Sequence, residues 1–255
     1  MDALFRWKMR VWWSRIGNSI RIAAGAPFVF TNWPCFFFSR YSREANILRL
    51  RNGLQFWIRP HSSDRASITE INILKPYTLP QSGATVLDIG ANIGSFALAA
   101  SQRAKCVYAL EPITGNFEVL TRNQKLNRAD NLHTFQLAVS AKNGSGVMSV
   151  NGVTSSLHWQ EKGTHTEPVK TVSLESFLDQ QGINRVDYLK MDCEGAEWDI
   201  ILQSPQHVLS RIMHIELEYH AIDGHPRPDA LLDRLRASGF SKLSARGGII
   251  IADRA

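Results

Sequence analysis

Cysteine is scarce in this chain, and its few copies form no pattern. The three cysteines, Cys35, Cys106 and Cys193, are odd in number and widely spaced, so they provide neither a disulfide framework nor a C-x-x-C metal pair. A reducing compartment, the cytosol, is therefore the expected location. Repeats and low-complexity tracts are absent as well. With 255 residues, we expect one large domain with an appendage rather than two domains.

A long, uninterrupted hydrophobic run is also missing. An uncharged stretch of 18 residues lies between Arg21 and Arg40, which is close to the lower limit for crossing a bilayer of about 30 Å. Pro27 and Pro34 interrupt it, and an interior proline breaks or kinks a helix. We therefore expect a shallow, non-spanning insertion. A cleaved signal peptide is not expected, because the first 21 residues are basic and aromatic.

Acidic residues are rare near the N-terminus. Residues 1–60 contain ten Lys or Arg and two Asp or Glu, a net charge of +8, whereas the remaining 195 residues carry −2. Five of the seven tryptophans lie in the same segment. On a helical wheel, apolar residues gather on one side and basic residues flank or oppose them: Phe5, Met9, Trp12, Trp13, Ile16 and Ile20 against Arg6, Lys8, Arg10, Arg15 and Arg21. This pattern predicts an amphipathic helix within an arm of residues 1–50.

Three interpretations of this arm stay open. Residues 1–40 could attach the protein to an anionic membrane surface, which would place it peripherally on the inner face of the membrane. The arm could instead pack on the rest of its own chain or form a homodimer. A third interpretation is binding of the arm to nucleic acid or to another anionic partner.

Residues 86–96, Val-Leu-Asp-Ile-Gly-Ala-Asn-Ile-Gly-Ser-Phe, form the most informative segment. Gly90 and Gly94 permit a sharp turn from strand to helix and a close approach of the backbone to a ligand. The next apolar run stops at Glu111, 23 residues after Asp88, where an acid can accept hydrogen bonds from two ribose hydroxyls. Neither a Walker lysine loop nor a third glycine at the dinucleotide spacing follows. A ligand with a ribose but no phosphate is favoured, and S-adenosylmethionine fits that description.

A second motif carries a family resemblance. Residues 187–197, Asp-Tyr-Leu-Lys-Met-Asp-Cys-Glu-Gly-Ala-Glu, contain a K-x-D-x-E-G-x-E pattern. Together with the loop at 88–94, this pattern resembles the FkbM-type family of S-adenosylmethionine-dependent methyltransferases. The resemblance covers residues 51–255, which we assign to one methyltransferase domain, and implies a class I Rossmann-like methyltransferase fold. It also implies methyl transfer to oxygen, often on sugars, and matches Glu70 to an acid that would pair with the methionine ammonium of the cofactor.

Apolar strand patterns alternate with helical patterns through this domain. The alternation predicts an α/β fold with a doubly wound, mostly parallel sheet covered by helices on both faces. The expected strands are Thr85–Ile89, Val107–Leu110, Thr134–Ala138, Tyr188–Met191 and Ile212–Leu217, and the expected helices are Ile93–Gln102, Asn116–Leu126 and Ala196–Leu202.

Ligands of a doubly wound sheet bind at the carboxyl ends of its strands. The predicted cofactor-binding residues therefore follow the first three strands: Asp88, Gly90, Asn92, Gly94, Glu111, Ala138 and Val139. The glycine loop, with Asn92, is expected to hold the methionine part, and Glu111 the ribose. The backbone at Ala138 and Val139 is expected to face the adenine.

The candidate catalytic residues follow the fourth and fifth strands. An alcohol is a weak nucleophile until a base removes its proton or a cation lowers its pKa. Asp192 ends the fourth strand and is interpreted as a base or metal ligand. Glu194 is expected to contact substrate or cofactor, and Glu197 to be structural, because acids are favoured in a first helical turn. His220 is the candidate general base by its ordinary pKa.

A metal ion is a further hypothesis. Glu218 and His220 alternate along the fifth strand and reach the same edge of the sheet. Glu218 and Asp192 could together hold a hard divalent cation such as magnesium between oxygen ligands.

The function predicted from the sequence is S-adenosylmethionine-dependent O-methylation of a sugar hydroxyl in a glycan or glycolipid. Nucleic acid is not expected as the substrate, because Asp-Cys-Glu-Gly stands at residues 192–195 where base methyltransferases carry an N-P-P-Y type motif. Two alternatives stay open. One is O-methylation of a small secondary metabolite, and the other is a non-catalytic module that binds S-adenosylmethionine.

Overall fold

The computed structural model describes residues 17–151, 154–156, 165–220 and 227–254. The chain divides into two compact units, Met1–Pro76 and Tyr77–Ala255. The boundary that we expected at residue 50 falls inside the first unit. Most of the predicted amphipathic helix, including Trp12 and Trp13, lies outside the described residues.

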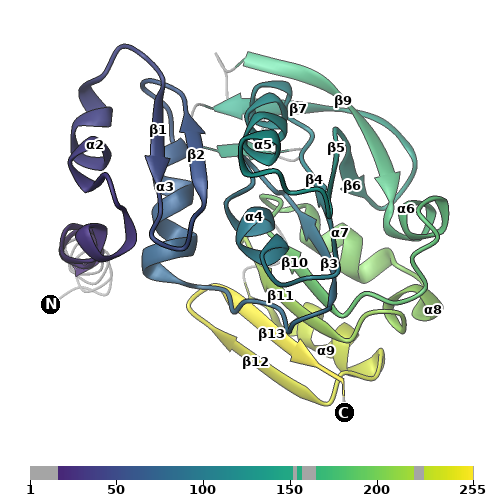
Figure 1. The fold of residues 1–255 in the computed structure, drawn as a ribbon. Helices are drawn as coiled ribbons and strands as arrows, with labels where there is room; N and C mark the ends of the chain where they lie inside the picture. Colours follow the sequence, from purple (N-terminus) through teal and green to yellow (C-terminus); the bar gives the residue numbers. More distant parts are fainter. Residues whose placement is uncertain (1–16, 152–153, 157–164, 221–226, 255) are drawn as a thin grey trace, which may run out of the picture. The chain divides into compact units, whose positions relative to one another are not determined.

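The N-terminal unit combines short helices with a β-hairpin (Figure 1). Its elements are a helix at residues 17–29, α2 (Trp33–Phe38), η1 (Ser39–Tyr41), β1 (Asn46–Arg49), β2 (Gln55–Ile58), α3 (Asp64–Thr69) and η2 (Glu70–Leu74). β1 and β2 pair antiparallel. The buried rings of Phe30 and Phe36 stack with centroids 4.8 Å apart. No helix among the residues described in the structure is long and apolar enough to span a bilayer.

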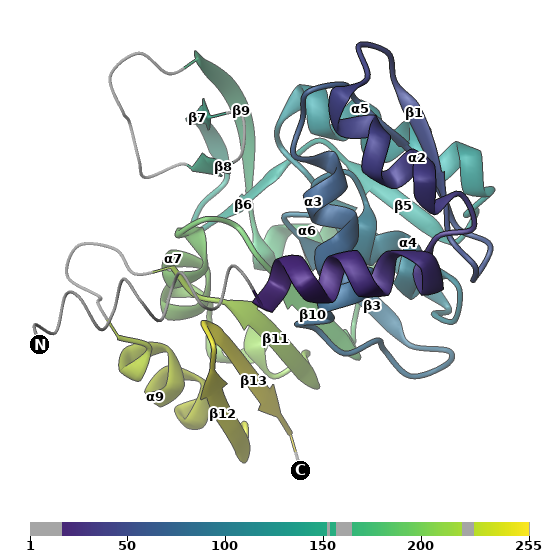
Figure 2. The same ribbon diagram turned by 90° about the vertical axis from the view of Figure 1, so that its left-hand side faces the viewer.

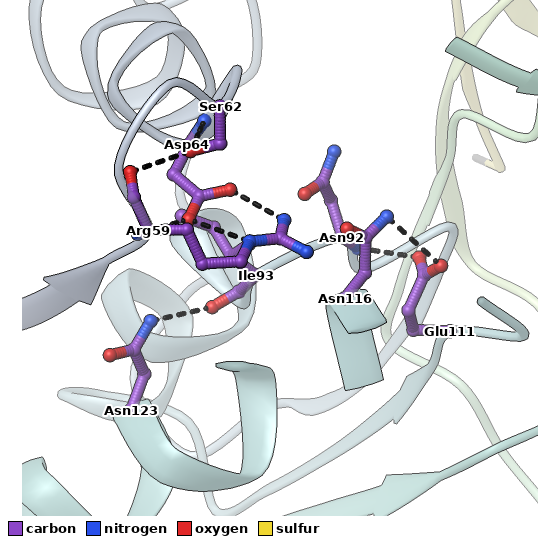
Figure 3. Close-up of polar contacts among 8 residues, drawn as sticks. All are labelled: Arg59, Ser62, Asp64, Asn92, Ile93, Glu111, Asn116 and Asn123. Carbon is purple, nitrogen blue, oxygen red and sulfur yellow. Dashed lines mark hydrogen bonds and ion pairs between the residues drawn. The ribbon is translucent and has the colours of Figure 1, made fainter. Parts of the chain in front are cut away.

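Asp64 stabilises the start of α3. Its buried carboxylate accepts hydrogen bonds from the backbone N–H of Arg59 at 2.8 Å and from the Arg59 guanidinium at 2.6 Å (Figure 3). An acid in the first turn of a helix also interacts favourably with the helix dipole. These contacts give Asp64 a structural role within the N-terminal unit.

The second unit contains a seven-stranded sheet (Figure 1). In spatial order, its strands are β12 (Lys242–Arg246), β13 (Ile249–Asp253), β11 (His214–Glu218), β10 (Tyr188–Met191), β3 (Thr85–Ile89), β4 (Cys106–Leu110) and β5 (Leu132–Phe135). The five strands from β11 to β5 are parallel, whereas β13 lies antiparallel between β11 and β12. Strand order reverses between β3 and β10, which is where sheets of this kind bind ligands. The predicted mostly parallel sheet is confirmed.

Helices cover both faces of this sheet (Figure 2). One face carries α4 (Ser95–Ser101) and α5 (Thr114–Asn127), and the other carries α6 (Leu174–Gln180), α7 (Ala196–Gln203), α8 (Gln206–Leu209) and α9 (Asp229–Ala237). Leu87, Leu189 and Trp198 belong to one buried cluster on the α7 face. Because side chains alternate along a strand, Asp88 and Lys190 lie on the face of the sheet opposite this cluster.

The predicted strand Thr134–Ala138 is wrong in its extent. β5 ends at Phe135, and Ala138–Ser140 is a separate strand, β6. β6 belongs to a second sheet of order β6-β9-β7-β8, with β7 (Gly144–Asn151), β8 (Thr154–Ser156) and β9 (His165–Ser173). This second sheet was not predicted from the sequence. β7 contains two glycines, two serines and one asparagine. These residues have weak strand preferences, so pairing with distant β9 decides the structure.

Candidate functional site

A glycine loop connects β3 to α4. Gly90 and Gly94 have φ angles of +79° and +87°, and Asn92 has a φ of +51°, so all three lie in the left-handed region. A Cβ atom on Gly90 would lie 1.8 Å from the carbonyl oxygen of Asp192. Only glycine combines this φ with this space. The loop is therefore packed directly against the turn that follows β10.

Glu111 joins the glycine loop to the end of β4. Its buried carboxylate accepts a hydrogen bond from the backbone N–H of Asn92 at 2.8 Å (Figure 3). It also accepts one from the backbone N–H of Ile113 at 3.0 Å. The side-chain amide of Asn116 lies 3.4 Å from the same carboxylate. A carboxylate has about four acceptor positions, so Glu111 can still accept from a ligand hydroxyl. Burial raises the pKa of Glu111 to about 7, although these hydrogen bonds oppose the shift.

Lys190 links the loop to Asp192. Its ammonium nitrogen donates to the carbonyl oxygen of Gly90 at 3.0 Å and lies 3.3 Å from Asp88 Oδ1 and 3.8 Å from Asp192 Oδ2. Burial raises the pKa of Asp88, and the positive charge of Lys190 opposes that shift. Lys190 was not among the site residues predicted from the sequence. It lies two residues before Asp192 in the same extended segment, and this spacing indicates that both side chains point to one face of the sheet.

Helix α7 holds His220 in one orientation. Glu197 Oε1 accepts from the backbone N–H of His220 at 2.7 Å and lies 3.0 Å from its Nδ1 atom. The indole N–H of Trp198 donates to the His220 carbonyl at 2.8 Å. The other ring nitrogen, Nε2, lies 3.3 Å from Glu194 Oε2. Glu197 is fully buried in the first turn of α7. Its two contacts with His220 give it a positioning role in addition to its favourable place at the start of the helix.

The surrounding carboxylates decide the charge of His220. Burial alone lowers the pKa of His220, but the hydrogen bond to Glu197 and the charges of Glu197, Glu194 and Asp192 raise it to about 9. The imidazole is therefore protonated at pH 7. A protonated ring cannot accept a proton, so the general-base role favoured from the sequence would first require His220 to lose this proton.

Asp192, Glu194 and His220 form a compact group of possible metal ligands. One ligand atom from each lies within 4.8 Å of the other two. Glu218, the predicted partner of Asp192, is not in that group. Its carboxylate accepts a hydrogen bond from the hydroxyl of Tyr77 at 3.2 Å, and burial raises its pKa. Magnesium between Asp192 and Glu218 stays a prediction.

Tyr77 is a site residue that the sequence analysis missed. In addition to its bond to Glu218, its ring centroid lies 5.6 Å from the ammonium nitrogen of Lys190, a cation–π distance. The next residue, Thr78, donates its backbone N–H to buried Glu216 at 2.9 Å and anchors the segment. Tyr77 precedes β3 in a segment without periodicity, so only the tertiary contact with β11 shows its role.

Three further residues, Glu70, Ala138 and Val139, were predicted to contact the cofactor. Glu70 begins η2 in the N-terminal unit. Ala138 and Val139 begin β6 and are buried, and Val139 packs in the hydrophobic core. Contacts of these residues with a cofactor stay predictions.

The strand order, with β13 inserted antiparallel between β11 and β12, defines the class I Rossmann-like methyltransferase fold. The glycine loop after β3 and the acid after β4 stand where this fold binds its ligand. Residues 88–242 match the family model described as the methyltransferase FkbM domain. The chain therefore belongs to the FkbM methyltransferase family, as the sequence motif predicted.

Two proteins and one solved structure are similar to this chain. AMB antimetabolite synthetase AmbE of Pseudomonas aeruginosa is 28% identical over 200 residues, which cover 62% of this chain and 9% of AmbE. The hexuronic acid methyltransferase AglP of Haloferax volcanii is 23% identical over 180 residues, which cover 66% of this chain and 69% of AglP. The methyltransferase FkbM of Methylobacillus flagellatus aligns with a TM-score of 0.46 and 14% identity, over 73% of this chain and 47% of that chain.

Proposed function

We propose that this protein transfers a methyl group from S-adenosylmethionine to a hydroxyl oxygen, and that the acceptor is a sugar. The contact between the glycine loop and the Asp192 turn carries the proposal, since no Cβ atom fits between Gly90 and the Asp192 carbonyl oxygen. A cofactor held by the loop and an acceptor held beside Asp192 would meet at one edge of the sheet. Methyl transfer requires this proximity of donor and acceptor.

The residues of the loop fit S-adenosylmethionine. Glu111 retains acceptor positions for ribose hydroxyls beyond its bonds to Asn92 and Ile113. Carboxylates of Asp192 and Glu218 face the same edge and favour a positively charged ligand. When bound, S-adenosylmethionine supplies a methyl group attached to a positively charged sulfur.

Asp192 is the residue that we assign to removing the proton of the acceptor hydroxyl. Its side chain is partly exposed, whereas that of Asp88 is fully buried, so of these two aspartates Asp192 is the one that can reach a substrate. Lys190 holds one oxygen of Asp192 toward the glycine loop. Both ring nitrogens of His220 face carboxylates, Nδ1 that of Glu197 and Nε2 that of Glu194, and the positive charge of the protonated ring would lower the pKa of a hydroxyl bound beside it.

A sugar acceptor is favoured by the chemistry of this group and by a relative. Carboxylate oxygens only accept hydrogen bonds when ionised, so Asp192 and Glu194 suit ligands that carry several hydroxyl donors. A hexuronic acid methyltransferase is among the relatives. The second candidate is a small secondary metabolite, which the similarity to an antimetabolite synthetase favours.

A transfer assay with different acceptors tests the proposal. The purified protein would be incubated with S-adenosylmethionine and either a hexuronic acid glycoside, a neutral sugar glycoside or hydroxylated non-sugar metabolites. Mass spectrometry would measure S-adenosylhomocysteine and the methylated product. We expect methylated sugar. Methylation of the non-sugar compounds alone would support the second candidate, and cofactor binding without any product would indicate a non-catalytic module.

The affinity for S-adenosylmethionine is expected to rise as pH increases from about 6 to about 8. Ribose hydroxyls donate to the ionised form of Glu111, whose pKa in the free protein is about 7, so binding releases a proton from the protonated fraction. Calorimetry in buffers of different ionisation enthalpy would measure this release.

Glu111→Gln provides the matched test of that pH dependence. The variant keeps the side-chain size but removes the titrating group, so affinity should fall by about tenfold or more, the range of charged hydrogen bonds, and lose its pH dependence. Glu118→Gln, at an exposed position on α5, serves as the control. Unchanged affinity in Glu111→Gln would contradict the assignment of Glu111 to the ribose.

A further inference from the structure

The helix at residues 17–29 is apolar on two opposite faces. Ala26 is fully buried, and a Cβ atom on Gly25 would lie 2.9 Å from the Ile73 side chain, so this face packs within the N-terminal unit. Ile20 and Phe28 are exposed. At about 100° per residue, both lie on the side opposite Ala26. The helix also carries Asn18, Ser19 and Arg21, so its exposed side combines apolar residues with a positive charge.

The exposed apolar surface continues beyond this helix. Five of the seven exposed large hydrophobic side chains among the described residues lie between positions 20 and 41. Their exposed fractions are 63% for Ile20, 80% for Phe28, 43% for Trp33, 70% for Phe38 and 71% for Tyr41. Exposed apolar residues that occur singly are normal on proteins, whereas five within 22 consecutive residues favour an interaction surface in this segment. We call these five residues the apolar surface.

The charge of the same segment has one sign. Residues 17–43 contain Arg21, Arg40 and Arg43 and no acid, and all three arginines are exposed. The guanidinium of Arg40 lies 4.9 Å from the centre of the Tyr41 ring. The occupant of the apolar surface should therefore be apolar and negatively charged.

We propose that the apolar surface docks on the interface of a membrane that contains anionic lipids. Aromatic side chains favour the boundary between headgroups and acyl chains, and apolar burial adds to the attraction between arginines and anionic headgroups. A second copy of this chain fits less well, because a symmetric dimer would bring two acid-free, basic segments together. This inference does not depend on the proposed function, since methyl transfer is assigned to the other unit.

The test uses the full-length protein and vesicles of two compositions. One set consists of phosphatidylcholine, and the other contains phosphatidylcholine and phosphatidylserine in a three-to-one ratio. We expect co-flotation with the anionic vesicles at low salt. Replacing an arginine, as in Arg40→Gln, should weaken binding about fivefold at low salt, and much less at 1 M salt, where the Debye length is about 3 Å.

A double variant tests the apolar surface itself. Phe28→Ser/Phe38→Ser should weaken binding to anionic vesicles by at least about tenfold for each phenylalanine that inserts. Val147→Ser changes an exposed apolar residue of the second unit and should bind as the unaltered protein does. Because all three side chains are exposed, we expect the same melting temperature in both variants as in the unaltered protein.

Three outcomes would overturn the proposal. The first is failure of the unaltered chain to float with anionic vesicles at low salt. The second is undiminished binding of Phe28→Ser/Phe38→Ser, which would move membrane contact to another segment. The third is a dimer, detected by light scattering, that the double variant disrupts without any vesicle binding in either form. That result would make the apolar surface a dimer interface.

Discussion

Asp192→Asn is expected to lower turnover by about 100-fold or more, the effect of removing a general base, while S-adenosylmethionine binding stays nearly unchanged. Asparagine has the size of aspartate but cannot take the proton of a hydroxyl group. The glycine loop and Glu111, to which we assign the cofactor, are joined by the hydrogen bond from Asn92 to Glu111, whereas the side chain of Asp192 lies beside Lys190. The loss should therefore appear in kcat rather than in cofactor affinity.

A surface aspartate supplies the control for this variant. Asp233 is exposed on α9 and pairs with Arg236, so Asp233→Asn should retain full turnover. Calorimetry would measure cofactor binding, and release of S-adenosylhomocysteine would measure turnover. If Asp192→Asn turns over at the normal rate, proton removal must be assigned to another residue of the group, such as Glu194 or His220 after it loses its proton.

Gly90→Ala is expected to abolish cofactor binding and to destabilise the second unit. The new methyl group would meet the carbonyl oxygen of Asp192 at 1.8 Å, so the glycine loop and the Asp192 turn would have to separate. A left-handed φ costs an alanine roughly 1–2 kcal/mol, and overpacking adds roughly 1–3 kcal/mol or more. Denaturant unfolding and calorimetry would measure the two effects.

Gly83→Ala isolates the contribution of the backbone angle. Gly83 has a φ of +80°, nearly the same as the +79° of Gly90, but nothing lies within 4 Å of its Cβ position. This variant should lose only about 1–2 kcal/mol and keep its affinity for S-adenosylmethionine. Equal destabilisation of Gly83→Ala and Gly90→Ala would show that the loop can move away from Asp192, which would contradict the packing of the site.

The central strands of the sheet could be predicted from the sequence. Thr85–Ile89 and Tyr188–Met191 occur with the expected bounds, because a parallel strand buried on both faces reads as a short, nearly continuous apolar run. The strand expected at Ile212–Leu217 is found at His214–Glu218. The four-stranded sheet formed by β6 to β9 was not predictable in this way. Its β7–β9 pairing joins segments about twenty residues apart and depends little on local preference.

Local spacing explains one pair in the site, although Lys190 was not among the predicted site residues. Lys190 and Asp192 lie on one face because they are two residues apart along one strand and its end, and the structure places them 3.8 Å apart. The pairing of Glu197 with His220 joins residues 23 positions apart, and that of Tyr77 with Glu218 joins residues 141 positions apart. The periodicity of hydrophobic residues along the sequence does not predict contacts between residues so far apart.

By itself, the sequence determined the glycine loop, the acid after β4, the K-x-D-x-E-G-x-E motif and the family to which the chain belongs. These features are local, because a strand, its turn and the following helix are specified by neighbouring residues. Only the tertiary structure decided that Glu197 holds His220 and that His220 is protonated at pH 7 with a pKa of about 9. A pKa depends on burial and on charges brought near by the fold, and those distances are absent from the order of residues along the chain.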